Sequence, residues 1–268
     1  MTTPITYYGG KQTLASTIIS MMPVHKIYCE PYFGGGAVFF AKGPSEVEVI
    51  NDHDSRLMTF YRCILDSFDE LQQIVQNTLH SEEEWKRAKK IFFDNHHRYS
   101  DLETAWSVWV MCNMSYSCSP TCGWKWDNAG STSASLYVKR QNFTDALCKR
   151  LKLVQISSRD AITVIQQRDS PDTFFYLDPP YLGCQQQHYR GFKTEDLIEL
   201  LTTLSKIQGR FILSHFMNRQ LQHAIKLNNW QYKVIDKPLT VANNVRATHR
   251  RKQELLVYNY VIEPSLFD

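Results

Sequence analysis

The sequence predicts an α/β fold in which a mainly parallel sheet is split by a helical insertion. Strand-like apolar runs alternate with amphipathic helices at both ends of the chain, whereas the middle carries helices without strands. The 268 residues, 43% of them hydrophobic, suffice for a full α/β core and a smaller second domain. We therefore expect residues 1–54 and 151–268 to form the sheet domain and residues 55–150 to form the insertion.

The N-terminal part contains a helix followed by strand, helix, strand and helix. Residues 12–22 place apolar side chains on one helical stripe, which Pro23 ends. The stretch HKIYCEPYFGGGAVFF, residues 25–40, indicates a strand, a glycine turn and the start of a helix. EVEVIND, residues 46–52, alternates like a strand and precedes a further helix, so the order is that of an opening parallel sheet.

The middle of the chain is predicted to be helical, with one long polar loop. EEEWKRAKKIFF and LETAWSVWVMCNM, residues 82–93 and 102–114, are two of these helices. The stretch from Ser115 to Ser135 is rich in serine, glycine and aromatic residues and lacks apolar periodicity, so we expect a loop there. Loops of this length are usually functional or disordered.

Strands and helices alternate again in the C-terminal part. We expect strands in LKLVQISSRD, TFFYL, RFILS, WQYKVIDKPLTV and QELLVYNYVI, and a helix in TEDLIELLTTLSKI. TFFYL must end at Asp178, because Pro179 and Pro180 cannot donate hydrogen bonds to a neighbouring strand. Ligands bind at the carboxyl ends of such strands, so Asp178 and Tyr181 would project into a crevice. The alternative is an ordinary turn after a strand.

Two glycine-containing turns are further candidates for ligand contacts. Gly34, Gly35 and Gly36 follow a strand, and Asp52 ends the next one, where a carboxylate can accept both hydroxyls of a ribose. A tight turn without a ligand is the alternative. Near the N-terminus, YYGGKQT places Lys11 beside a helix start where a carboxylate could dock.

Charge and cysteine content narrow the class of protein. The net charge of +3 is too small to indicate a nucleic-acid partner by itself, but VANNVRATHRRKQ and YVKRQNFTDALCKRLK are basic stretches that fit phosphate contact or a solvated face. Seven cysteines, an odd and scattered number, predict reduced thiols. Cys118 and Cys122 with His96 and His97 lack the spacing of a zinc site, so we expect no metal.

No run reaches the roughly 18 apolar residues of a membrane span, and the start resembles no signal peptide, which predicts a cytoplasmic protein.

Six segments in order resemble the Dam-like class of S-adenosylmethionine-dependent DNA N6-adenine methyltransferases. They are YYGGKQTLASTIISMMP, EPYFGGGAVFF, VEVIND, SSRD, LDPPY and QELLVYNY, and the resemblance spans most of residues 5–54 and 150–260. It implies a Rossmann-like methyltransferase sheet, S-adenosylmethionine as cofactor, and duplex DNA as partner. The insertion would be a mainly helical target-recognition domain.

The resemblance also implies roles for individual residues. Cofactor contacts would come from Tyr8, Gly9, Gly10, Lys11, Glu30, Phe33, Gly34, Gly36, Asp52, Asp160 and Asp178. Asp178 and the Pro179 carbonyl would accept the two N6 hydrogens of adenine, Pro180 would stiffen the turn, and Tyr181 would stack on the flipped base. DNA contacts would come from Asn113, Tyr116, Lys125, Lys139, Arg140, Tyr189, Arg246, Arg250 and Arg251. Tyr189 and Phe192 would belong to a lid.

The insertion departs from the pattern of the class. Asn113 and Tyr116 match, but Ser117 and Cys118 stand where relatives carry Asn-Gly, so the recognition sequence does not follow. Trp124, Lys125 and Trp126 fit either a nucleic-acid contact or a small core. Methylation of cytosine N4 or of RNA adenine, and a non-catalytic binding protein, are the alternatives. The modification would serve restriction with a cognate endonuclease, or epigenetic marking, in a bacterium or phage; the oligomeric state is not predicted.

Overall fold

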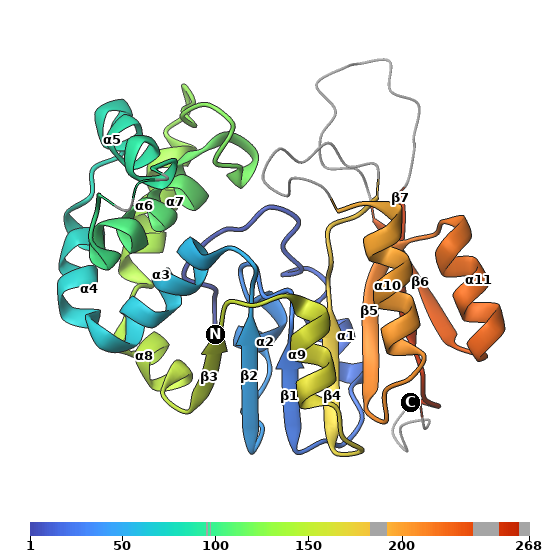
Figure 1. Cartoon of the computed structure of the whole chain (residues 1–268). Helices are drawn as coiled ribbons and strands as arrows, with labels where there is room; N and C mark the ends of the chain where they lie inside the picture. The colour runs from blue at the N-terminus through green and yellow to red at the C-terminus, as the bar shows by residue number, and fades with distance from the viewer. Residues whose placement is uncertain (95, 97, 183–191, 238–251, 263–268) are drawn as a thin grey trace, which may run out of the picture.

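The predicted sheet is present in the computed structural model, which describes residues 1–94, 96, 98–182, 192–237 and 252–262. Seven strands within these ranges form one sheet in the order β3-β2-β1-β4-β5-β7-β6 (Figure 1). Their bounds are β1 Ile27–Glu30, β2 Val47–Asn51, β3 Val154–Ser157, β4 Thr173–Leu177, β5 Arg210–Phe216, β6 Gln231–Lys237 and β7 Lys252–Tyr258. β7 runs antiparallel to both β5 and β6, whereas β1 to β5 pair in parallel, so the sheet is mixed.

Helices cover both faces of the sheet and gather beyond its β3 edge (Figure 1). Those next to the sheet are α1 Ala15–Met21, α2 Ala37–Ala41, α9 Ala161–Arg168, α10 Thr194–Leu204 and α11 Arg219–Asn228. Between β2 and β3 the chain forms α3 Ser55–Asp66, α4 Phe68–Asn77, α5 Glu82–Phe92, α6 Asp101–Met114, the 3₁₀ turn η1 Tyr116–Cys118, α7 Ser131–Gln141 and α8 Asp145–Leu151. The helices α3 to α8 thus lie between β2 and β3 along the chain.

The alternation of side chains along β4 explains the two layers. Phe174 and Tyr176 point to the face where α1, α2 and α3 pack, and Phe175 and Leu177 point to the face covered by α9, α10 and α11. All five residues of β4 are buried, as expected for a central strand with helices on both faces. This strand therefore gives Asp178 a rigid support.

The helical segment shares its core with the sheet. Tyr61 of α3 packs edge to face on Phe33 beside the glycine turn, with ring centroids 4.8 Å apart. The buried residues of α6 belong to the same continuous apolar cluster. The helices α3 and α6 therefore share one apolar core with Phe33, next to the turn that follows β1.

The predicted polar loop ends earlier than expected, because α7 begins at Ser131. Gly130 adopts a left-handed conformation with φ +72° just before the helix. The Asp127 carboxylate accepts hydrogen bonds from the backbone amides of Ala129, Ser131 and Thr132. The prediction of a loop to Ser135 was wrong because this capping, rather than apolar periodicity, starts the helix.

Candidate active site

A cavity of about 1220 Å³ opens at the carboxyl ends of β1, β2 and β4. The strand order reverses between β1 and β4, which is the place where open α/β sheets bind ligands. The cavity is lined by all the residues predicted from the sequence to contact the cofactor or the target base in the sheet domain: Tyr8, Gly9, Gly10, Lys11, Glu30, Phe33, Gly34, Gly36, Asp52, Asp160, Asp178, Pro179, Pro180 and Tyr181. Residues from five separate segments of the chain thus meet in one place.

Lys11 holds the carboxylate of Asp178 at the mouth of β4. The ammonium Nζ donates to Oδ1 at 2.7 Å and to Oδ2 at 2.6 Å, and it also donates to the Gly9 carbonyl at 3.0 Å. The Lys11 side chain is only 5% exposed, whereas that of Asp178 is 20% exposed, so the ammonium is shielded from solvent and the carboxylate stays accessible from the cavity. Removal from water raises the pKa of the Asp178 carboxyl, and the charge of Lys11 opposes that rise.

Tyr181 lies against the same carboxylate. Its hydroxyl is 3.1 Å from Asp178 Oδ1 and 2.7 Å from Oε1 of Glu254, a buried residue of β7. The ring packs edge to face on Phe216, with centroids 4.5 Å apart, and lies 5.0 Å from the ring of His215. Four side chains from different strands and segments therefore fix where the tyrosine ring points.

The glycine turn is built around Asp52. The carboxylate accepts from the Gly34 amide at 2.9 Å and from the Asp54 amide at 3.0 Å. Gly34 and Gly36 have φ of +49° and +63°, and a Cβ on Gly36 would lie 2.4 Å from the Phe33 ring. Only glycine fits this turn, and burial raises the pKa of the Asp52 carboxyl to about 6.

Glu30 ends β1 at the floor of the cavity. Oε2 accepts a hydrogen bond of 2.7 Å from the hydroxyl of Tyr28, and burial raises the pKa of Glu30 to about 8. A carboxyl with such a pKa is largely protonated at neutral pH and ionises readily when a cation arrives. Glu30 is therefore suited to bind a cationic group of a ligand.

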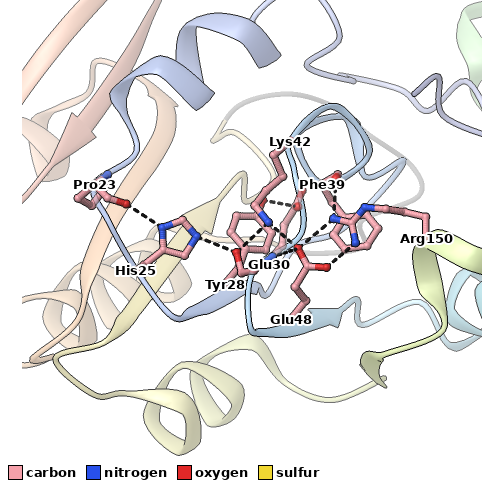
Figure 2. A network of polar contacts seen from close by, with 9 residues as sticks. Pro23, His25, Tyr28, Glu30, Phe39, Lys42, Glu48 and Arg150 are labelled. Carbon is pink, nitrogen blue, oxygen red and sulfur yellow. Dashed lines mark hydrogen bonds and ion pairs between the residues drawn. The ribbon is translucent and has the colours of Figure 1, made fainter. Parts of the chain in front are cut away.

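A network of buried charges lies next to Tyr28 and Glu30 (Figure 2). The carboxylate of Glu48 in β2 accepts from Lys42 and from both terminal nitrogens of Arg150 in α8. Arg150 also donates to the Phe39 carbonyl of α2 at 2.9 Å, and Lys42 Nζ lies 4.3 Å from the centre of the Tyr28 ring. This network joins the last helix of the insertion to the first two strands and to the helix after the glycine turn.

Asp160 both lines the cavity and begins a helix. Its Oδ2 accepts from the Thr163 amide at 2.9 Å, so Asp160 is the N-cap of α9. Asp160 thus has a definite capping role in the fold. Its contact with the cofactor adenine stays a prediction.

The described residues among those predicted to contact DNA lie outside the cavity, and several already have protein partners. Asn113 accepts from the Thr6 amide, Lys139 donates to the Thr3 carbonyl, and Arg140 donates to the Thr78 carbonyl. Tyr116 and Lys125 lie in the hairpin formed by the pairing of Ser115 with Trp124. The other predicted contacts lie outside the described residues: Tyr189, Arg246, Arg250 and Arg251.

Two exposed rings lie at the base of this hairpin, beside the pairing of Ser115 with Trp124. Tyr116 is 42% exposed and Trp126 is 53% exposed, and the Tyr116 hydroxyl donates to the Trp126 carbonyl at 2.9 Å. Ser117 and Cys118, which stand in place of the Asn-Gly of relatives, both have positive φ, at 55° and 53°. Ser117 and Cys118 therefore adopt a left-handed backbone that Asn and Gly adopt with less strain.

Glu254 is a site residue that was not predicted. It lies in QELLVYNY, but the sequence gives no sign that β7 would bring it beside Lys11, whose Nζ is 3.5 Å from Oε1. Only the strand order, with β7 next to β5, reveals this neighbourhood. The sequence shows only that Glu254 is an acid at the start of an apolar strand, which does not indicate its neighbours.

The described residues contain no group of three side chains that could bind a metal ion. His97, one of the zinc candidates, lies outside those residues. Among the helices that the structure describes, none has the length and apolar character to cross a membrane.

The fold and the cavity at the switch point are those of a Rossmann-like methyltransferase. Residues 7–237 match the model of the D12 class N6 adenine-specific DNA methyltransferases. The chain belongs to this family, so it is an adenine-specific DNA methyltransferase with S-adenosylmethionine as its methyl donor.

The chain is similar to individual proteins at low identity. The chain is 24% identical over 277 residues to the type II methyltransferase M1.LlaDCHI of Lactococcus lactis subsp. cremoris, covering 94% of this chain and 93% of that protein. It is 22% identical to the modification methylase StsI of Streptococcus sanguinis, covering 96% of this chain but only 42% of that longer protein. A solved precorrin-8w decarboxylase from Methanobacterium thermoautotrophicum superposes with a TM-score of 0.41 at 8% identity, covering 93% of this chain and 90% of that one.

Proposed function

We propose that the cavity binds S-adenosylmethionine and an adenine flipped out of duplex DNA, and that Asp178, Pro179 and Tyr181 present the adenine N6 for methylation. The observation that carries this proposal is that the Asp-Pro-Pro-Tyr segment and the glycine turn with Asp52 line the same cavity. A target amine and a methyl donor must meet within a few ångströms for direct transfer. One shared cavity satisfies this requirement.

The lining of the cavity fits the cofactor chemically. S-adenosylmethionine supplies a methyl group already activated on a sulfonium, and it also carries a cationic amine. The carboxyls of Glu30, Asp52, Asp160 and Asp178 give the cavity an acidic character, and Lys11 is a cation among them. Glu30 is proposed to hold the amino group and Asp52 the ribose.

The chain's own residues then act on the adenine. The N6 amine is a weak nucleophile because its lone pair is delocalised into the ring, so its hydrogens must be held as charge develops. Asp178 accepts one N6 hydrogen, and the Pro179 carbonyl, on a backbone stiffened by Pro180, accepts the other. Tyr181 offers its ring to the base, as expected for a flipped nucleotide.

The helical segment between β2 and β3, within residues 55–150, is proposed to recognise the target sequence. Its support is the exposed pair of Tyr116 and Trp126 beside Lys125, since aromatic rings with a neighbouring cation suit contacts with nucleic acid. Because one relative is named a type II methyltransferase and the other a modification methylase, we further propose that the methylation protects DNA from a cognate restriction endonuclease.

Product analysis tests the proposal. Wild type and Asp178→Ala are incubated with labelled S-adenosylmethionine and unmethylated duplex DNA or RNA, and the products are digested to nucleosides and identified by mass. N6-methyladenine in DNA from wild type alone is expected. N4-methylcytosine, or transfer to RNA only, would replace the proposed substrate, and equal transfer by Asp178→Ala would remove the role of Asp178.

A further inference from the structure

Glu254 is a buried carboxylate beside Lys11, Asp178 and Tyr181, and its contacts indicate what it does. It is 3% exposed, lies on β7 opposite Phe216 of β5, and accepts from the Tyr181 hydroxyl at 2.7 Å. Its Oε1 is also 3.5 Å from the ammonium of Lys11. A buried ionisable group of this kind is costly unless its partners need it.

The Tyr181 hydroxyl has one proton and two carboxylates within reach. It lies 2.7 Å from Glu254 and 3.1 Å from Asp178 Oδ1, so the shorter contact favours donation to Glu254. If Glu254 carried no charge, the Asp178 carboxylate would be the stronger acceptor, because hydrogen bonds to ionised groups are about twice as strong as neutral ones. The phenol would then compete with the adenine amine for Asp178.

Lys11 lies between the same two carboxylates. Its ammonium contacts both oxygens of Asp178 and has Glu254 as its other carboxylate neighbour. With Glu254 present, one cation is shared between two anions, and the charge on Asp178 is not fully neutralised. A carboxylate that keeps part of its charge is the better acceptor for the N6 hydrogen.

We propose that Glu254 is a positioning residue for methyl transfer: it takes the phenol proton of Tyr181 and shares Lys11, and so keeps Asp178 free to accept from the adenine amine. This inference rests on the proposed function of Asp178. It adds a residue that neither touches the adenine nor belongs to the Asp-Pro-Pro-Tyr segment.

The first test is the isosteric change Glu254→Gln, with Glu46→Gln, an exposed acid before β2, as the matched control. We expect kcat to fall about tenfold, while the Kd for S-adenosylmethionine from calorimetry and the melting temperature stay near wild type. The further change Tyr181→Phe should lower the kcat of Glu254→Gln by a smaller factor than it lowers the kcat of wild type. The phenol proton that competes for Asp178 is then absent in both backgrounds. Equal kcat for wild type and Glu254→Gln, or additive losses in the double variant, would overturn the proposal.

The pH dependence separates this role from a structural one. Within the described residues, the titratable groups that act on Asp178 from the surrounding elements include Lys11, Glu30, Tyr176, Tyr181, His215 and Glu254. The negative charge of Glu254 raises the pKa of Asp178, so Glu254→Gln should lower that pKa. The acid limb of the plot of kcat against pH should therefore move to lower pH. An acid limb that stays in place or moves upward in Glu254→Gln would contradict the proposal.

A milder variant keeps the test decisive if Glu254→Gln fails to fold. Tyr181→Phe alone preserves every charge in the site. If the phenol proton belongs to Glu254, the acid limb of kcat stays where it is, whereas a shift to higher pH would show that Tyr181 donates to Asp178. Wild type that transfers no methyl group at all would instead contradict the proposed function, which keeps the two failures distinct.

Discussion

Lys11 and Asp178 are 167 residues apart in the chain, yet the lysine ammonium lies 2.7 and 2.6 Å from the two oxygens of the carboxylate. The N-terminal glycine turn thus contacts the catalytic turn after β4 directly. The pair joins two of the six segments that resemble the Dam-like class, YYGGKQT and LDPPY. It makes the protonation state of Asp178 depend on a residue from the other end of the site.

Replacing Lys11 by methionine should move the acid limb of methylation to higher pH. The ammonium lowers the pKa of Asp178 against the effect of burial, so its loss lets the pKa rise further. The change is measured as kcat against pH. Lys26→Met, which removes an exposed cation paired with Asp172, should leave the profile unchanged, and an unshifted limb in Lys11→Met would contradict the account.

Binding of S-adenosylmethionine should tighten as the pH rises from about 6 to 8. Glu30 has a pKa of about 8 in the free protein, and a cationic ligand lowers it, so binding releases a proton in this range. The Kd should fall by up to about tenfold per pH unit and level off above the pKa. Calorimetry in buffers of different ionisation enthalpy measures the released proton. Glu30→Gln should bind without this pH dependence; if it retains the dependence, Glu30 is not the group that titrates.

Glu48→Gln should destabilise the protein by about 3–5 kcal/mol, because it leaves Lys42 and Arg150 buried without their anion. Burial raises the pKa of Glu48, but hydrogen bonds from Arg150 and Lys42 outweigh it and hold the pKa below its usual value. The stability from this network should therefore be lost as the pH falls. Urea unfolding measures both effects. The exposed Glu82→Gln, which breaks a pair with Lys86, should cost less than about 0.5 kcal/mol.

Ser117→Gly should stabilise the protein by about 1 kcal/mol. Ser117 is exposed and has φ 55°, a conformation that costs a residue with a Cβ roughly 1–2 kcal/mol and glycine little. Part of this gain is offset by the greater freedom of glycine in the unfolded chain. Thermal unfolding measures the change. Ser133→Gly, in the first turn of α7, should lower stability instead, and a loss at both positions would refute the argument from backbone strain.

The strands and the acids at their ends could be read from the sequence because each is a local feature. Phe174 to Leu177 form an apolar run that a double proline stops, and Asp52 closes an alternating run, so both carboxylates were predicted at the correct edge. The glycine triplet was likewise recognisable. These signals need no knowledge of which strands are neighbours.

The contacts between distant segments could not be predicted in the same way. The pairing of Lys11 with Asp178 and the place of Glu254 depend on strand order and on the antiparallel course of β7, which crossover connections decide. The start of α7 was misplaced because Asp127 caps it, a short-range contact without apolar periodicity. The partners of Lys139 and Arg140 likewise lie on other segments of the chain.

The most direct test of the account is the rate of methyl transfer to adenine N6 by Asp178→Asn, measured in single turnover beside the binding of cofactor and DNA. The substitution keeps the shape of the side chain and removes the charge that should hold the N6 hydrogen. The account predicts a rate at least about a hundredfold lower, as for the loss of one oriented electrostatic contact, with cofactor and DNA still bound. A rate within a few-fold of wild type would contradict it.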